Sequence, residues 1–332
     1  MKRILLISFC SASAVSFAQQ NDSISISINL DPVSIYTEKK HTNTTEKPIF
    51  QHQDIFQQSN EIKLIKRSSY AIDPSFRANQ YEQLNVQFDG GIKAMNACPN
   101  RMDPITTHLS SNQIQEIEII KGPYSMRFGP NFGGIINLIS NQVSTENGWK
   151  NSLSTAYSTN PNAFINHFQT SYVQTKFDVL AGYNYSDYGN YKDGDNREIP
   201  SSFRSQDYHL KIGLKTTNKS RYEIGFQQQF GRDIKHASLP MDTSYDDTSI
   251  GYFIGKTMFE NSSLQEIQSR VYGSFVKHQM HNLNRPNAKM MEMISDVESK
   301  TLGAKIEAIW KMNDVQLFTG FDGYLLNRDG YR

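Results

Sequence analysis

From residue 148 onward, hydrophobic and polar residues mostly alternate within segments of about ten residues, a pattern typical of strands whose two faces meet different surroundings. Turn residues separate the segments, as at Asn160-Pro161-Asn162 and Asn313-Asp314. The strands predicted in this way are Trp149–Thr159, Phe164–Val173, Phe177–Tyr185, Tyr208–Thr216, Arg221–Gly231, Ser249–Phe259, Leu264–Met280, Lys300–Trp310 and Val315–Asn327. Aromatic-rich strands of this length are typical of a transmembrane β-barrel, and a soluble β-sandwich is the alternative.

The connections after the first two strands alternate in length. Short ones at 174–176, 218–219 and 261–263 alternate with long ones at 186–200, 232–248 and 281–299. Outer-membrane barrels have short periplasmic turns and long extracellular loops. We therefore expect the third, fifth and seventh strands to run outward, with their carboxyl ends at the cell exterior.

Residues 48–147 do not show this regular alternation of hydrophobic and polar residues, and their pattern predicts a small α/β domain. Residues 54–64 have helical spacing, and Tyr81–Asp89 alternates as a strand. The stretch Ile117–Ser140, IEIIKGPYSMRFGPNFGGIINLIS, predicts two strands joined by a turn, because Gly and Pro mark points where the backbone bends tightly.

The N-terminus carries the pattern of an exported protein. Lys2 and Arg3 precede the apolar stretch Ile4–Val15, and Ser16-Phe17-Ala18 offers a cleavage site, so residues 1–18 are predicted to be a secretory signal. A buried N-terminal helix is the alternative. Residues 19–47 are polar and predict an extended, mobile segment.

Composition removes several classes of function. The chain has 34 basic and 33 acidic residues, without a long run of either sign, which argues against binding of nucleic acid. No nucleophile–base pair, phosphate loop or paired-carboxylate motif stands out, so we expect a protein that is not an enzyme. A polar average does not argue against a membrane barrel, because lipid-facing and lumen-facing residues alternate.

Once the signal is removed, Cys98 is the remaining cysteine, and it cannot close an internal disulfide. Met102 lies four residues further on, in a loop-like segment broken by Pro99 and Pro104. A thiolate and a thioether on one side of a turn form half of a site that would select Cu(I). The alternative is a small buried hydrophobe beside a core-filling methionine.

His278 and Met280 lie near the end of the predicted strand 264–280. Residues two apart share one face of a strand. That face also carries Arg270, Tyr272 and Ser274, so we expect it to line the lumen, whereas Val271 and Phe275 meet lipid. The pair would project inward at the outer rim, over the domain that carries Cys98. An incidental polar pair at a strand end is the alternative.

The stretch 117–140 resembles the end of the plug domain in TonB-dependent outer-membrane receptors. This resemblance implies an α/β plug domain followed by antiparallel transmembrane β-barrel strands, in the bacterial outer membrane and in contact with its lipid. It also implies TonB, with its ExbB–ExbD energy supply, as a partner. The candidate TonB box, which would add a strand to a sheet of TonB, consists of Leu30, Asp31, Pro32, Val33, Ser34, Ile35 and Tyr36. A disordered linker is the alternative.

Asp89-Gly90 followed by Ala97–Pro104 is similar to the plug motif of the copper receptors in this family. The resemblance implies a copper ion as cargo and a metal ligand set of Cys98, Met102, His278 and Met280. Uptake of another cargo, such as a siderophore or cobalamin, is the first alternative function, and a truncated, non-transporting product is the second. Weaker candidate residues are His108, His281, Met95, Met126, Met290, Met291 and Met293.

The number of predicted strands falls short of the 22 strands of plugged transporters. We therefore expect an incomplete barrel in a truncated chain. The expected organisation is a signal at 1–18, a flexible segment with the TonB box at 19–47, a plug domain at 48–147 and the N-terminal portion of the barrel at 148–332.

Overall fold

The computed structural model describes residues 5–7, 56, 61–121, 126–129, 132–217 and 219–331. The candidate TonB box, Leu30–Tyr36, lies outside these residues, and so does the predicted signal apart from Leu5–Ile7. Both stay predictions.

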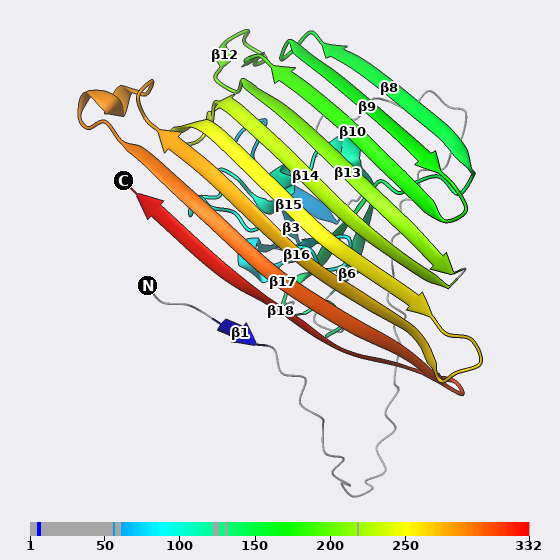
Figure 1. The fold of residues 1–332 in the computed structure, drawn as a ribbon. Helices are drawn as coiled ribbons and strands as arrows, with labels where there is room; N and C mark the ends of the chain where they lie inside the picture. The colour runs from blue at the N-terminus through cyan, green and yellow to red at the C-terminus, as the bar shows by residue number, and fades with distance from the viewer. Residues whose placement is uncertain are drawn as a thin grey trace, which may run out of the picture.

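Nine long strands form one curved antiparallel sheet in which each strand pairs with the next along the chain (Figure 1). They are β8 (Gly148–Ser158), β9 (Ala163–Val173), β10 (Phe177–Tyr188), β13 (Phe203–Thr217), β14 (Ser220–Ile234), β15 (Asp242–Met258), β16 (Leu264–His281), β17 (Ile294–Met312) and β18 (Val315–Tyr331). Every predicted barrel strand is present, and several continue further at the end where the long loops lie. We call this the outer sheet.

Four short elements accompany the outer sheet. Strand β1 (Leu5–Ile7) pairs antiparallel with β18. Strands β11 (Tyr191–Lys192) and β12 (Glu198–Ile199) form a hairpin in the loop after β10, and the 3-10 helix η4 (Pro286–Lys289) lies in the loop after β16. The β12 hairpin and η4 therefore mark the long-loop end of the sheet (Figure 1).

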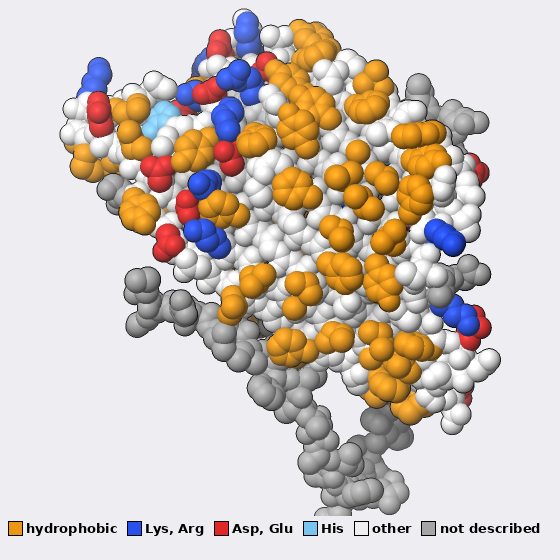
Figure 2. Space-filling view, viewed as in Figure 1, with side chains coloured by type: hydrophobic (Ala, Val, Ile, Leu, Met, Phe, Trp, Pro, Cys, Tyr) orange, Lys and Arg blue, Asp and Glu red, His pale blue; other side chains and the backbone are white. Residues whose placement is uncertain are grey.

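The outer sheet has one apolar exposed face and one covered face. On β16, Val271 is 49% exposed whereas Tyr272 is 1% exposed, so the expected division between lipid-facing and lumen-facing positions is confirmed there. On β13, Leu210 and Ile212 are exposed on either side of the buried Lys211. Figure 2 shows hydrophobic side chains spread over the outward face and charged ones gathered near the long loops. Such a surface suits contact with lipid. Among the described residues, no helix has the length and apolar character needed to cross a membrane.

The described residues between 56 and 140 form an inner domain that packs against the covered face of the outer sheet (Figure 1). One small sheet contains β2 (Ile62–Lys66), β3 (Ile72–Phe76) and β4 (Asn79–Gln80). In the other, β7 (Gly134–Ser140) lies between β5 (Asn85–Phe88), to which it is parallel, and β6 (Ile114–Lys121), to which it is antiparallel. The strands β6 and β7 are the pair predicted from the motif 117–140.

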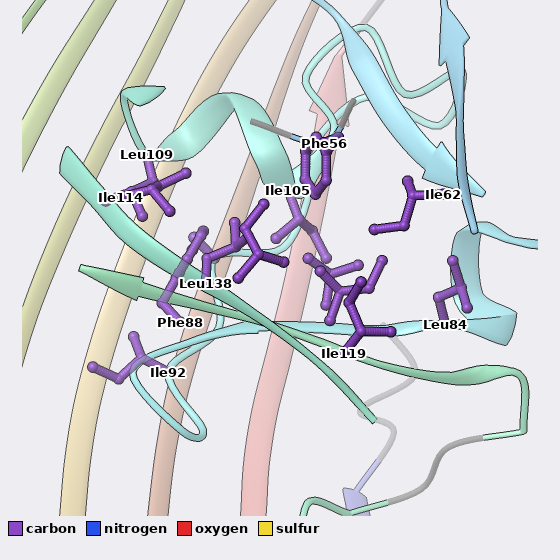
Figure 3. Packing of buried hydrophobic residues seen from close by; sticks show 14 of the residues in the cluster. Phe56, Ile62, Leu84, Phe88, Ile92, Ile105, Leu109, Ile114, Ile119 and Leu138 are labelled. Carbon is purple, nitrogen blue, oxygen red and sulfur yellow. The ribbon is translucent and has the colours of Figure 1, made fainter. Parts of the chain in front are cut away.

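The described part of the inner domain contains three 3-10 helices, η1 (Tyr81–Gln83), η2 (Ile105–His108) and η3 (Ser111–Gln113), and Phe56 is α-helical, as predicted. The helical spacing predicted through Leu64 is wrong at its end, because Ile62–Lys66 pairs with β3 as strand β2. The strand predicted at Tyr81–Asp89 begins with η1 and becomes a strand only at β5. Figure 3 shows side chains such as Ile105, Ile119 and Leu138 meeting in one core.

The core reaches the outer sheet through Ile250 and Tyr272, and polar contacts also bind the inner domain to the sheet. Arg270 Nε donates to the carbonyl of Asp89 at 2.8 Å, and Ser274 Oγ donates to the carbonyl of Lys93 at 3.0 Å. Hydrogen bonds of this kind can be exchanged with water at a small net cost.

Candidate metal centre

Cys98 lies in the loop between β5 and η2, whose shape comes from local hydrogen bonds. The Cys98 carbonyl accepts the N–H of Arg101 at 2.9 Å and closes a tight turn. The Asp103 carboxylate accepts the N–H groups of Ala97 at 2.6 Å and Cys98 at 2.9 Å. Cys98 and Met102 are consequently held as buried side chains, 0% and 2% exposed.

Arg101 anchors this loop to strand β3. Its guanidinium forms a bidentate ion pair with Asp73, with an Nε–Oδ2 distance of 2.9 Å and an Nη2–Oδ1 distance of 2.8 Å. Burial alone would lower the pKa of Arg101, but the hydrogen bonds and charge of Asp73 outweigh it and the pKa is raised. Arg101 adopts the left-handed backbone conformation, with φ at 54°, and the ion pair holds that turn in place.

The second half of the site comes from the outer sheet. His278 and Met280 on β16 point to the covered face and are 0% and 5% exposed. Asp246 lies directly opposite His278 on β15, with Oδ1 3.3 Å from Nδ1, and it also accepts the Tyr70 hydroxyl at 2.8 Å. A carboxylate on one ring nitrogen orients an imidazole and leaves the other nitrogen as the metal ligand.

These two halves meet. Cys98 Sγ lies 3.8 Å from Met280 Sδ. Ligand atoms of Cys98, Asp103 and His278 lie within 4.8 Å of one another, and Met102 packs in the same buried cluster. The structure therefore brings together all four residues that the sequence singled out, two from the inner-domain loop and two from β16.

The chemistry of this donor set is soft. It offers one thiol, two thioethers and one imidazole, all buried, and such ligands prefer Cu(I) to hard cations. Burial raises the pKa of Asp103 to about 7, although the nearby His278 opposes this shift. Because both Asp103 oxygens already accept backbone N–H groups, we regard Asp103 as the residue that positions Cys98.

Several neighbours of the site were missed by sequence reasoning. Asp246 and Thr243 contact His278, and Met241 packs against the sulfur cluster. Of the weaker loop candidates, Met290 and Met291 are exposed on the surface, whereas Met293 packs against the cluster. The pairing of β15 with β16 is the signal that could have revealed Asp246.

No family model and no curated protein sequence matches this chain. Among solved structures, the chain is similar to the copper transporter OprC, with a TM-score of 0.82 at 22% identity over 90% of this chain and 47% of that one. It is also similar to the FrpB iron transporter from Neisseria meningitidis (TM-score 0.72, 12% identity, 86% and 47% covered). A third similar structure is the Serratia marcescens hemophore receptor HasR, in complex with its hemophore and heme (TM-score 0.74, 15% identity, 91% and 46% covered).

These similar structures are TonB-dependent outer-membrane receptors, and their likeness confirms the expected fold. The chain spans about half the length of each of them. They are transporters and receptors rather than enzymes, and their names mention copper, iron and heme. The fold agrees with the outer-membrane location expected from the sequence.

Proposed function

We propose that this protein is a TonB-dependent receptor of the outer membrane that takes up copper ions. The observation that carries the proposal is the meeting of Cys98 and Met102 with His278 and Met280 in one buried, sulfur-rich cluster. Sulfur and imidazole ligands bind Cu(I) well, and a buried thiol without a disulfide partner has a reason to be present if it binds metal. The similarity to a copper transporter supports the same cargo.

The dimensions of the site favour a bare ion over a larger cargo. Cys98 and His278 are both 0% exposed, and their ligand atoms are close enough to share one ion. A siderophore or cobalamin would need an open cavity lined by aromatic and basic side chains. Those cargoes remain the first alternative function, because the similar structures include receptors named for iron and heme.

The division of the site between two parts of the molecule suggests how the ion would be released. TonB would bind the segment Leu30–Tyr36 by strand addition and, powered by ExbB–ExbD, pull on the inner domain. Movement of the inner-domain loop would withdraw Cys98 and Met102 from His278 and Met280. An ion held by four ligands would then keep two of them and be free to leave inward. The lipid-facing side of the outer sheet would remain in place.

The test is the copper content of the protein purified from outer membranes, measured by mass spectrometry. We expect one copper ion per chain in the wild type, none in Cys98→Ala and a reduced content in Met102→Leu. Met95→Leu is the matched control, since Met95 lies in the same loop but packs against the hydrophobic core of the inner domain. It should keep its copper.

Heat-modifiable migration in gel electrophoresis would verify that each variant is folded. A folded wild type without copper would contradict the proposed cargo and favour a different one. Copper that persists in Cys98→Ala would contradict the site. Copper binding without uptake into cells would favour the second alternative, a product that binds metal but does not transport it.

A further inference from the structure

We propose that Tyr70 is a positioning residue of the metal centre, which keeps His278 in place only while the turn that carries Tyr70 is docked against the outer sheet. The inference rests on the proposed function, because it concerns the same copper site. Tyr70 lies in the turn between β2 and β3 of the inner domain, whereas His278 lies on β16 of the outer sheet. The turn carries none of the four ligands, so its link to the site is indirect.

The first observation is a chain of contacts that joins the turn to the ligand. Tyr70 Oη donates to Asp246 Oδ2 at 2.8 Å, and Asp246 Oδ1 lies 3.3 Å from His278 Nδ1. The two contacts use different oxygens of one carboxylate, so Asp246 is held from both sides. Burial raises the pKa of Tyr70 well above its ordinary value, so the hydroxyl keeps its proton and remains a donor. Asp246 and His278 are 1% and 0% exposed, so water cannot readily replace a lost contact.

The second observation is that the outer sheet leaves room for this hydroxyl. A Cβ atom at Gly231 would lie 2.8 Å from Tyr70 Oη, so a side chain at this position of β14 would push the hydroxyl away. Gln229, on the same face of β14, donates its Nε2 hydrogen to Tyr70 Oη at 3.2 Å. The Tyr70 ring packs edge-on against Phe203 of β13, with the ring centroids 5.3 Å apart. Together with Asp246 of β15, three strands thus form the place that Tyr70 occupies.

The third observation is that the same region anchors the loop that carries the inner-domain ligands. Asp73, three residues after Tyr70, forms the bidentate ion pair with Arg101 that holds this loop. Ser68 Oγ accepts the N–H groups of Tyr70 at 3.1 Å and Ala71 at 2.9 Å, which keeps the turn compact. The turn and the start of β3 therefore contact both halves of the metal centre, one through Tyr70 and the other through Asp73.

These contacts couple the docking of the turn to the affinity for copper. If the docked Tyr70 raises the affinity for Cu(I), bound Cu(I) must stabilise the docked turn by the same factor, because such coupling is reciprocal. Loss of an outer partner of a metal ligand typically costs about 10–100-fold in metal affinity. Strand β2 leads directly into this turn, so a pull from the N-terminal side would reach Tyr70 along the chain before it reaches Cys98. Movement of the turn alone would then weaken the site.

The first measurement is the Cu(I) affinity of four proteins, determined by competition with a coloured chelator in detergent solution. They are the wild type, Tyr70→Phe, Asp246→Ala and the double variant. Tyr70→Phe keeps the ring and removes only the hydroxyl, and we expect its affinity to fall about tenfold. Added to Asp246→Ala, the same change should cause no further loss, because the link through Asp246 is already absent.

Tyr188→Phe is the matched control. Tyr188 is buried in the same hydrophobic cluster as Tyr70 and stacks on Phe203, with the ring centroids 4.4 Å apart. This variant should bind Cu(I) with the affinity of the wild type. A loss equal to that of Tyr70→Phe would mean that packing in the cluster, and not the contact with Asp246, sets the affinity, and it would overturn the inference.

The second measurement is hydrogen exchange in a peptide that contains Ala71, with and without Cu(I). A purely structural role of the hydroxyl would change exchange equally in both conditions. Reciprocal coupling predicts that Cu(I) slows exchange about tenfold more in the wild type than in Tyr70→Phe. Equal slowing in the two proteins would contradict the coupling.

The outcomes separate this inference from the proposed function. Wild-type affinity in Tyr70→Phe, or the same loss with and without Asp246→Ala, would overturn the role of Tyr70 and leave the copper site standing. A folded wild type that retains no Cu(I) would overturn both.

Discussion

The sulfur atoms of Cys98 and Met280 lie 3.8 Å apart, although 182 residues separate them along the chain. One belongs to a loop of the inner domain and the other to β16 of the outer sheet. The contact therefore exists only while the two parts are docked against each other. A metal ion bound at this point would report on the docking, and a movement of the inner domain would change the number of ligands that it has.

Met280→Leu should weaken Cu(I) binding with little effect on the fold. A leucine fills nearly the same volume, and such exchanges in a core typically cost less than about 1.5 kcal/mol. The thioether ligand, however, is lost. We expect the affinity for Cu(I), measured by competition with a chelator, to fall by at least about tenfold.

Met258→Leu provides the matched control for that measurement. Met258 lies at the opposite end of β15 and is 49% exposed, so it cannot contribute to the site. Equal affinities in the two leucine variants would remove Met280 from the ligand set.

Asp246→Asn should reduce Cu(I) affinity although Asp246 is not a ligand in the proposal. The carboxylate orients His278 through Nδ1, and loss of such a partner typically costs about 10–100-fold in metal affinity. Asp247→Asn is the control at the adjacent position, where the side chain pairs with Arg232 and is partly exposed. If both variants bind Cu(I) like the wild type, then His278 does not depend on Asp246 for its orientation.

The fold was largely predictable because lipid imposes a simple pattern. Each predicted barrel strand is present, since a strand between lipid and an inner domain must alternate. The strand ends at the outer rim were missed: β15 begins at Asp242 and not at Ser249, and β17 begins at Ile294 and not at Lys300. These segments lie beyond the lipid-facing part of the strands and are held by backbone pairing. Because backbone pairing does not require hydrophobic and polar residues to alternate, the sequence contains no strand signal there.

The site was predictable in its ligands and not in their surroundings. Sulfur and imidazole side chains can be recognised in a sequence as candidate ligands for a soft metal. This applies to Cys98 and Met102, which are four residues apart, and to His278 and Met280, which share one face of a strand. Asp246 carries no such signal, because nothing in its local sequence marks it. Its place follows from the hairpin: Met258 pairs with Glu266, and continuing that register brings Asp246 opposite His278. Buried neighbours of this kind depend on three-dimensional packing.

Asp73→Asn should loosen the loop that carries Cys98. Asp73 is 2% exposed and holds both prongs of the Arg101 guanidinium, and removal of one partner from a buried ion pair typically costs about 3–5 kcal/mol. Hydrogen exchange at the N–H groups of Ala97 and Cys98 should accelerate by roughly 100-fold to several thousandfold, since 1.4 kcal/mol corresponds to a factor of ten.

Glu82→Gln tests the specificity of that effect. Glu82 also contacts Arg101, at 3.2 Å, but its side chain is 71% exposed. Exposed pairs contribute about 0–1 kcal/mol, so exchange in the loop should change little. Equal acceleration in the two variants would indicate that the Asp73 contact is not the anchor of the loop.

His108 should make the inner domain less stable in acid. It is fully buried on η2, with Nδ1 2.8 Å from Thr248 Oγ1, and burial lowers its pKa to about 4. An unfolded histidine titrates near 6.5. Its contribution to stability is therefore complete above pH 6.5 and is lost progressively as the pH falls toward 4. At pH 5 the loss should be about 2 kcal/mol.

The pH profile of the wild type alone cannot isolate this effect, because Asp103 acts in the opposite sense. Burial raises the pKa of Asp103 to about 7, so protonation of this carboxyl group makes the folded state more stable as the pH falls. The informative quantity is the difference between the wild type and His108→Asn, in which the amide can replace the Nδ1 contact with Thr248. Denaturant unfolding at pH 7.5 and pH 5 should show the wild type losing about 2 kcal/mol more than the variant. Parallel losses in the two proteins would mean that His108 is not held neutral by burial.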